Sequence, residues 1–203
     1  MIPKVVHYIW LGKGTRSKLM QQCMASWFLH LKGWRIQCWN EDNLPIEHPY
    51  VEKAMRLKQY AFASDYLRFH ILEKYGGIYL DTDMELISSL DSFLDLNAFL
   101  GHQSPGRLNA GIIGSSPNHA FLKRVLEEYD LMTEAGKFEI ICDVIERCYS
   151  KLKYGDISIF EQSHFYPYNP YHEFVQRRQG QLMYSDLKDD TVAIHHWAKT
   201  WNI

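Results

Sequence analysis

The chain has 203 residues, of which 46% are hydrophobic, so it can bury a sizeable core, and we expect one domain over residues 1–203. Its 22 Lys and Arg nearly balance its 24 Asp and Glu, which argues against a nucleic-acid-binding protein and against a polybasic membrane patch. There is no long apolar run, no basic leader with a cleavage site and no CxxC pair among the four cysteines, so we expect a cytoplasmic protein with free thiols that makes at most peripheral contact with the inner face of the membrane.

The first third of the chain predicts a strand, a helix and a second strand. Residues 2–10 are rich in β-branched and aromatic side chains, which is typical of a strand, and two glycines then form a loop. Apolar side chains at helical spacing predict a helix over residues 17–31, and residues 35–39 predict a strand that ends in a polar loop. A further helix over residues 51–60 follows. Ligands of open α/β sheets bind beyond the carboxyl ends of the strands, so we expect the loops after residues 10 and 39 to lie side by side.

The stretch over residues 63–86 reads ASDYLRFHILEKYGGIYLDTDMEL and predicts a helix followed by a strand. Ser64 is a candidate helix cap, and the two glycines after Tyr75 are typical of a helix C-terminus. On a helical wheel, Asp65 and Arg68 fall inside the apolar face of this helix. Buried charges have to be paired, so these two residues form either an internal salt bridge or part of a polar site.

The strand after the glycines ends in two carboxylates. Alternation along a strand places Tyr79, Asp81 and Asp83 on one face and the aliphatic side chains on the other. At about 3.3 Å per residue the two carboxylates stand roughly 6.5 to 7 Å apart, and like charges held this close favour a bound cation. Carboxylate oxygens suit Mg2+ or Mn2+, and such a metal keeps open positions for water and substrate phosphates. A lone DxD motif is a weak signal, but one that ends a strand behind a helix with buried charges indicates a site.

The second half of the chain predicts strands over residues 98–101, 109–115 and 156–160 and amphipathic helices over residues 118–132 and 138–151. Gly111 removes a side chain inside a strand, which suggests close approach of a packed neighbour or of a ligand. The segment HFYPYNPYH predicts a rigid aromatic loop. Near the C-terminus, His195 and His196 face opposite ways if they lie on a strand, so only one of them can reach a site.

Several of these segments resemble glycosyltransferase family 32, which is related to the glucosyltransferase domains of the large clostridial toxins. ASDYLR and YGGIYLDTD resemble the DxD-containing sugar-binding region of the family, IPKVVHYIWLG its opening, and IHHWAKTW its closing segment. The resemblance implies a GT-A-type nucleotide-sugar-binding fold, an α/β architecture with a mixed, mostly parallel central sheet flanked by helices. It also implies that the DxD motif and a divalent metal, Mn2+ or Mg2+, hold the diphosphate, and that the anomeric configuration is retained.

The same resemblance implies roles for individual residues. Trp10 is expected to stack on the nucleotide base, Asn43 in WNEDN to contact the uracil, and Trp201 to contribute to substrate binding. A neutral imidazole suits Mn2+ beside carboxylates. The resemblance implies His196 rather than His195 as this ligand, because the acidic metal ligand of the toxin relatives lies five residues before a conserved tryptophan. The expected metal ligands are Asp81, Asp83 and His196.

The charge that develops in a sugar transfer assigns further roles. Breaking the bond between a sugar and its nucleoside diphosphate leaves negative charge on the diphosphate, so Arg68 is expected to reach the phosphate or the sugar. Asp65 is suited to accept hydrogen bonds from sugar hydroxyls, and Tyr79 to donate one to the ribose or the phosphate. The expected catalytic residues are Asp65, Arg68, Asp81 and Asp83.

The motifs and the family resemblance together predict a metal-dependent glycosyltransferase that moves a hexose from a nucleotide sugar to a saccharide or lipid-linked saccharide acceptor, and the resemblance implies a retaining one. We favour a UDP-sugar as the donor, with GDP-mannose as the main competitor, and family habit suggests synthesis of a bacterial surface polysaccharide or capsule. One alternative is a haloacid-dehalogenase-type phosphatase with Asp81 as its nucleophile, although Glu85 stands where such sites usually have Thr or Val. The other alternative is a catalytically silent carbohydrate-binding module, against which the intact charged residues argue.

Overall fold

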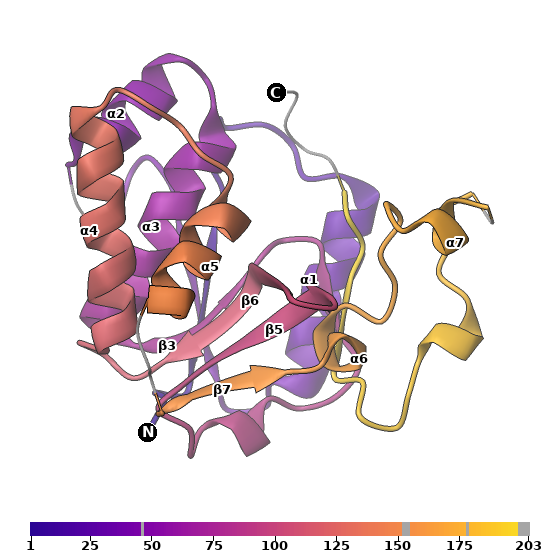
Figure 1. Ribbon diagram of the computed structural model, residues 1–203. Helices are drawn as coiled ribbons and strands as arrows, with labels where there is room; N and C mark the ends of the chain where they lie inside the picture. The colour runs from indigo at the N-terminus through magenta and orange to yellow at the C-terminus, as the bar shows by residue number, and fades with distance from the viewer. Residues whose placement is uncertain (46, 152–154, 178, 199–203) are drawn as a thin grey trace.

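The computed structural model describes residues 1–45, 47–151, 155–177 and 179–198. Its centre is a six-stranded sheet with the order β2-β1-β3-β6-β5-β7 (Figure 1). β6 runs antiparallel to both of its neighbours, whereas the other neighbouring strands are parallel, which confirms the expected mixed, mostly parallel sheet. The strands of this sheet are β1 (Val5–Ile9), β2 (Arg35–Trp39), β3 (Gly77–Leu80), β5 (Ala98–Ser104), β6 (Arg107–Ser115) and β7 (Ile157–Phe160).

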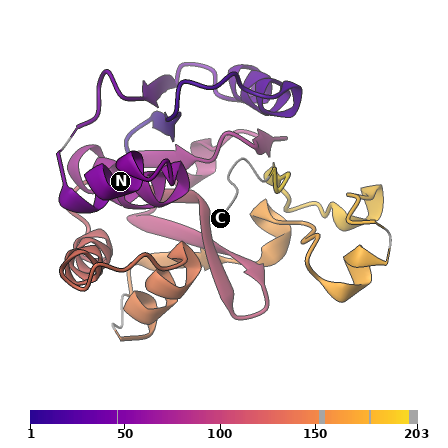
Figure 2. The ribbon, with the colours of Figure 1, turned by 90° about the horizontal axis from the view of Figure 1, so that it is seen from above.

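Helices cover both faces of the sheet, and Figure 2 shows α1 and α4 on opposite sides of it. Side chains of β3 alternate between the two cores: Tyr79 packs in the core formed with α2 to α5, whereas Ile78 and Leu80 pack in the core formed with α1. No helix within the described ranges is long and apolar enough to cross a membrane. The helices are α1 (Lys18–His30), α2 (Pro49–Arg56), α3 (Tyr60–Tyr75), α4 (Ala120–Glu134), α5 (Ile141–Lys151), α6 (Gln162–Phe165) and α7 (Glu173–Gln176), with 3-10 turns at Asp91–Phe93 and Tyr184–Asp186.

A second, two-stranded sheet joins the end of the chain to the DxD segment. Its strands β4 (Met84–Leu86) and β8 (Ala193–His195) pair antiparallel, with Met84 opposite His195. α1 is fixed to β4 by two buried hydrogen bonds. The indole of Trp27 donates to the Met84 carbonyl at 2.7 Å, and the Leu86 amide donates to the Ser26 hydroxyl at 2.8 Å. The first helix and the last strand therefore both lie beside residues 81–83.

The central helix begins earlier than the sequence predicts. α3 starts at Tyr60, after Gln59, whose side chain makes no capping hydrogen bond, so Ser64 lies inside the helix and is not its cap. Its hydroxyl instead lies 3.2 Å from the Tyr79 hydroxyl. The predicted glycine stop is confirmed: Gly76 has φ 63°, and a Cβ there would lie 2.7 Å from a Pro117 ring carbon.

Candidate metal centre and active site

Asp65 and Arg68 form a buried ion pair on α3. Their side chains approach to 2.8 Å, and the residues are only 8% and 5% exposed. Residues three apart share a face of a helix, which explains the pairing. Arg68 Nη1 also donates to the Ala110 carbonyl at 2.8 Å and lies 3.3 Å from Oδ1 of Asp81. The pair is therefore an internal salt bridge, and its Arg68 also reaches the DxD motif.

Asp81 follows β3 and is held through one of its two carboxylate oxygens. The Tyr79 hydroxyl donates to Oδ1 at 2.9 Å, and the Arg68 guanidinium approaches the same oxygen. The guanidinium also lies over the Tyr79 ring, 4.6 Å from its centroid. A Cβ on Gly111 would lie 3.2 Å from Oδ2 of Asp81 and 3.3 Å from the Tyr166 hydroxyl, so the DxD motif is one of the close neighbours of this glycine. The described polar contacts of the Asp81 carboxylate fall on Oδ1.

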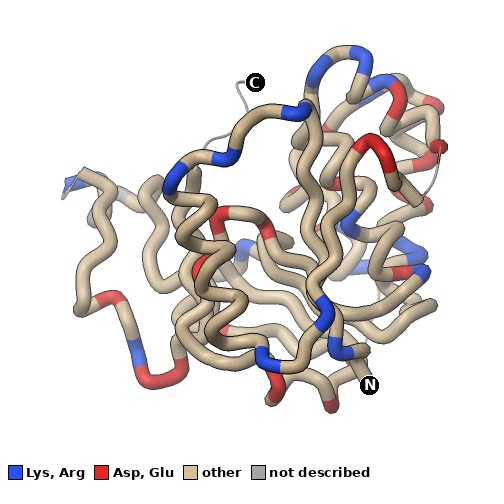
Figure 3. Tube along the Cα trace, turned by 180° about the vertical axis from the view of Figure 1, so that it is seen from behind, with Lys and Arg blue, Asp and Glu red and all other residues tan. Residues whose placement is uncertain are grey.

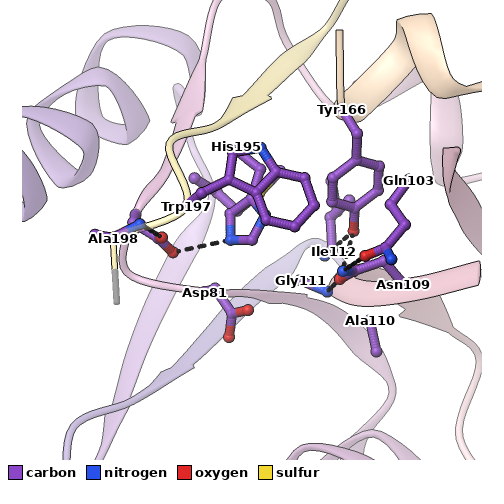
Figure 4. A network of polar contacts seen from close by, with 12 residues as sticks. Asp81, Gln103, Asn109, Ala110, Gly111, Ile112, Tyr166, His195, Trp197 and Ala198 are labelled. Atoms are coloured by element: carbon purple, nitrogen blue, oxygen red, sulfur yellow. Dashed lines mark hydrogen bonds and ion pairs between the residues drawn. The ribbon is translucent and has the colours of Figure 1, made fainter. Parts of the chain in front are cut away.

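Asp83 lies in the turn between β3 and β4 and is held by the C-terminal segment. Its Oδ1 lies 3.3 Å from His195 Nε2, and its Oδ2 accepts a hydrogen bond from the Ala198 amide at 2.8 Å (Figure 4). Its main-chain carbonyl accepts a further bond from the His196 amide at 3.1 Å. Segments more than a hundred residues apart in the sequence thus meet at this carboxylate.

The structure brings His195 to the carboxylates, which corrects the expectation that His196 would be the metal-facing histidine. The antiparallel pairing of β4 and β8 places Met84 opposite His195 and Glu85 opposite Ile194. Because side chains alternate along a strand, His196 follows the face of Ile194, and its Nε2 lies 2.7 Å from Glu85. The expectation that only one of the two histidines reaches the carboxylates is confirmed.

Three carboxylates, the Arg68 guanidinium and the His195 imidazole meet in this cluster, and their pKa values are set by burial and by mutual charge. Burial raises the pKa of Asp65 to about 7 even though the Arg68 charge opposes the shift, and burial raises the pKa of Asp81 in the same way. Burial disfavours ionisation of Asp83 too, but His195 lowers the pKa of this carboxyl below its ordinary value. Burial lowers the pKa of His195, but the Asp83 charge outweighs it, so that pKa is raised. Burial therefore opposes full ionisation of the carboxylates, and Arg68 and His195 are the groups that offset their charge.

The cluster has the donor atoms that a divalent cation requires. Asp81, Asp83 and His195 each offer one ligand atom, and these atoms lie within 4.8 Å of one another. Two carboxylate oxygens and an imidazole nitrogen suit Mn2+. In addition, Nδ1 of His195 is buried and has no hydrogen-bond partner among the described residues, so this imidazole is not fully satisfied by protein. These residues fit a bound divalent metal.

A polar network beside the cluster was not predicted from the sequence. The Tyr166 hydroxyl accepts from the Ile112 amide and donates to Oδ1 of Asn109, both at 3.2 Å (Figure 4). Asn109 in turn donates to the side chain of Gln103. The Tyr166 ring also packs edge-on against His195, with 5.7 Å between the centroids. Two signals point to this network: Tyr166 belongs to the predicted aromatic loop, and Asn109 lies two residues before Gly111 in β6.

The residues expected around the nucleotide base lie on the loops after β1 and β2. The Trp10 amide donates to the Trp39 carbonyl at 2.9 Å, which confirms that these loops lie side by side. The Trp10 ring is partly exposed and is stacked by Arg16, 5.2 Å from its centroid. Asn43 is exposed, and its amide group bonds to the Cys38 carbonyl and to the Asn40 amide of its own turn. Trp201 lies outside the described residues.

Comparison with known proteins shows that the chain is similar to glycosyltransferases. Residues 17–100 match the family model described as "Glycosyltransferase sugar-binding region containing DXD motif". The chain is 29% identical to an uncharacterized glycosyltransferase of Acanthamoeba polyphaga mimivirus, over 85% of this chain and 76% of that protein. It is 24% identical to inositol phosphoceramide mannosyltransferase 3 of Schizosaccharomyces pombe, over 97% of this chain and 60% of that protein.

Solved structures show the same architecture. The PaToxG glycosyltransferase superposes with a TM-score of 0.62 over 74% of this chain and 69% of that one, at 17% sequence identity. At this identity the likeness concerns the fold alone, and it confirms the expected GT-A-type arrangement. The chain spans about three fifths of the length of the yeast relative.

Proposed function

We propose that this chain is a glycosyltransferase that transfers a hexose from a nucleotide sugar, with retention of the anomeric configuration. The match of residues 17–100 to the DxD-containing sugar-binding region supports the proposal. The observation that carries the proposal is the convergence of Asp81, Asp83 and His195 beside the buried Arg68. We favour a UDP-sugar as the donor and Mn2+ as the metal. GDP-mannose is the competing donor, and the similarity to the yeast mannosyltransferase supports it.

The residues that hold the donor follow from where charge develops. A divalent cation held by Asp81, Asp83 and His195 would neutralise charge on the diphosphate as the bond to the sugar breaks. Arg68 fixes Asp81 through Oδ1, so that Oδ2 stays available, and it adds positive charge near the leaving group. Asp65 is proposed to accept hydrogen bonds from sugar hydroxyls, and Tyr79 to donate to the ribose or the phosphate.

The nucleotide base is proposed to bind over the loops after β1 and β2. The Trp10 ring is partly exposed and so offers an aromatic face for stacking. Both polar atoms of the Asn43 amide are engaged in its own turn, so its contribution would be to shape the loop unless that turn opens. Trp201 is proposed to contribute to substrate binding.

The acceptor is proposed to be a saccharide that is attached to a lipid. The yeast relative is named for a ceramide substrate, which favours a lipid-anchored acceptor over a free polysaccharide. All four cysteines are free in the structure, and three of them are buried, which supports a reducing compartment such as the cytoplasm. Work at the inner face of a membrane would then bring the enzyme to its acceptor.

The phosphatase alternative fits the site less well. It requires Asp81 to act as a nucleophile, but Oδ1 of this carboxylate is bound by both Tyr79 and Arg68. A guanidinium and a phenol on one oxygen orient the carboxylate and reduce its nucleophilicity. Release of inorganic phosphate from a phosphate ester, with a trapped acyl phosphate on Asp81, would nevertheless favour this alternative.

Nucleotide binding tests the proposal before any acceptor is known. A thermal-shift screen of nucleoside diphosphates with and without Mn2+ is expected to show a rise in Tm of about 5 °C or more for UDP with Mn2+ at saturation. Asp83→Asn should abolish the Mn2+-dependent part of this shift, and Asp95→Asn, at an exposed acid before β5, is the matched control. A rise in Tm with UDP that is the same with and without Mn2+ would contradict the proposed site.

A further inference from the structure

The nearly neutral total charge of the chain conceals a strong segregation. The first 40 residues contain six Lys and Arg and no Asp or Glu, whereas the other 163 contain 16 basic and 24 acidic residues. These first 40 residues form β1, α1 and β2, which lie together at one side of the molecule (Figure 2). The expectation that balanced charge argues against a basic surface therefore needs correction, because opposite charges gather on different parts of the fold.

The outer face of α1 is basic at its ends and apolar near its C-terminal end. Its exposed residues recur at helical spacing and so form one stripe. In order along this face they are Lys18, Gln21, Gln22, Ala25, Phe28 and Leu29, with Lys32 just beyond the helix. Phe28 and Leu29 are large apolar side chains, yet they are 69% and 70% exposed. Figure 3 shows Lys and Arg at both ends of this helix and no acidic residue along it.

Nearby acids do not cancel this charge. Asp91 lies near the C-terminal end of α1, but it is paired with Lys4 at 2.9 Å. Glu41, which follows β2, accepts a hydrogen bond from the Gly12 amide. Within the described part of the chain, Lys18 and Lys32 form no ion pair. The stripe therefore presents free positive charge on either side of exposed apolar side chains.

We propose that the outer face of α1 is a docking surface for an anionic lipid membrane. Two large apolar side chains between lysines match the boundary between acyl chains and anionic headgroups, where apolar burial and electrostatic attraction act together. A nucleic acid would use the lysines but would leave Phe28 and Leu29 in water. Lipid therefore explains both the charge and the apolar exposure.

The inner face of α1 connects this surface to the candidate active site. Trp27 and Ser26 bind β4, the strand that directly follows Asp83. Docking through the outer face would hold the DxD segment about one helix diameter, roughly 10 to 12 Å, from the headgroups. An acceptor embedded in the membrane, which is the kind of acceptor proposed above, would then lie within reach of the donor site.

Vesicle co-sedimentation tests the inference without nucleotide or metal, so its result does not depend on the proposed transfer reaction. The full chain is expected to pellet with phosphatidylcholine vesicles that contain about 30% phosphatidylserine and to bind pure phosphatidylcholine at least about tenfold more weakly. Binding should weaken as NaCl is raised from about 0.1 M to about 0.5 M, because salt screens the lysines.

Two double variants separate the contribution of the lysines to vesicle binding from that of the apolar side chains. Lys18→Glu/Lys32→Glu and Phe28→Ser/Leu29→Ser should each lower the partition coefficient about tenfold or more, with unchanged circular dichroism and Tm. Lys123→Glu/Leu131→Ser on α4, where both residues are also exposed, is the matched control and should bind like the wild type. Equal pelleting of all three variants would overturn the proposal. So would a wild-type dimer in light scattering that Phe28→Ser/Leu29→Ser dissociates, together with no vesicle binding, because a second copy would then cover this face.

Discussion

The Nε2 atom of His195 lies 3.3 Å from Oδ1 of Asp83. This contact joins the last strand of the described chain to the motif that ends the central strand. It depends on the β4–β8 pairing, which sets Met84 opposite His195. The register of a short two-stranded sheet therefore decides which of two adjacent histidines faces the carboxylates.

Substitution of the two histidines tests that register. His195→Ala should lower the affinity for Mn2+, measured by titration in the presence of UDP, by about tenfold or more, because a candidate ligand is lost. His196→Ala removes a partly exposed contact with Glu85 and should change the affinity by less than about threefold. A larger loss in His196→Ala than in His195→Ala would show that the toxin-based register was correct and that this arrangement is not the metal-bound one.

Loss of the buried guanidinium should be costly for stability. Arg68→Met leaves Asp65 and Asp81 without their common cation, and removal of one partner of a buried pair destabilises by about 3 to 5 kcal/mol. Asp65→Leu/Arg68→Met should be less destabilised than Arg68→Met, since one of the two stranded carboxylates is gone. Urea denaturation measures both values, and a double variant no more stable than Arg68→Met would contradict the proposed pairing.

The Tyr166 hydroxyl is expected to hold the network beside the carboxylates. Tyr166→Phe leaves the Ile112 amide without a partner and removes a donor to Asn109, so it should destabilise by about 1 to 3 kcal/mol. Tyr129→Phe is the matched control, because the Tyr129 hydroxyl is equally buried but has no hydrogen-bond partner among the described residues. Removal of the Tyr129 hydroxyl should leave the free energy of unfolding unchanged or raise it. Equal losses of unfolding free energy in the two variants would contradict the described network.

Stability should also fall in acid through His7, a buried histidine that is not one of the candidate metal ligands. Burial lowers the pKa of His7 to about 4, and the ring is held neutral between the Gly76 carbonyl and the Trp39 indole N–H. The unfolded chain has an ordinary histidine pKa of about 6.5, so it binds more protons than the folded chain between these values. The contribution of His7 to the free energy of unfolding is therefore fully present above about pH 6.5. It is lost as the pH falls toward 4, by up to about 3 kcal/mol.

His7→Gln cannot titrate, so it isolates this contribution. Denaturation curves at a series of pH values should show a smaller loss of unfolding free energy between pH 7 and pH 4.5 in His7→Gln than in the wild type. If the free energy of unfolding depends on pH in the same way in both proteins, His7 is protonated in the folded state without loss of stability.

Local patterns predicted the parts of the site that lie on one segment. Strand alternation placed Tyr79 and Asp81 together, helical spacing paired Asp65 with Arg68, and the glycines marked the end of α3. These inferences need only the period of a helix or a strand.

Contacts between distant segments could not be read in the same way. The choice of His195 depends on how β8 pairs with β4, and the network of Asn109 and Tyr166 depends on how a loop packs on β6. The start of α3 also differed, because Ser64 was a plausible cap by type but is used inside the helix to contact Tyr79. The basic face of α1 was visible in the sequence but was masked by the total charge.

Anomalous diffraction at the manganese edge, from crystals grown with Mn2+ and UDP, tests the central claim most directly. We predict a single strong peak at about 2.0 to 2.3 Å from carboxylate oxygens of Asp81 or Asp83 and from a His195 nitrogen, with the diphosphate of UDP on its open side. A manganese peak bound elsewhere, or UDP bound in the crystal with no manganese beside these residues, would contradict the account.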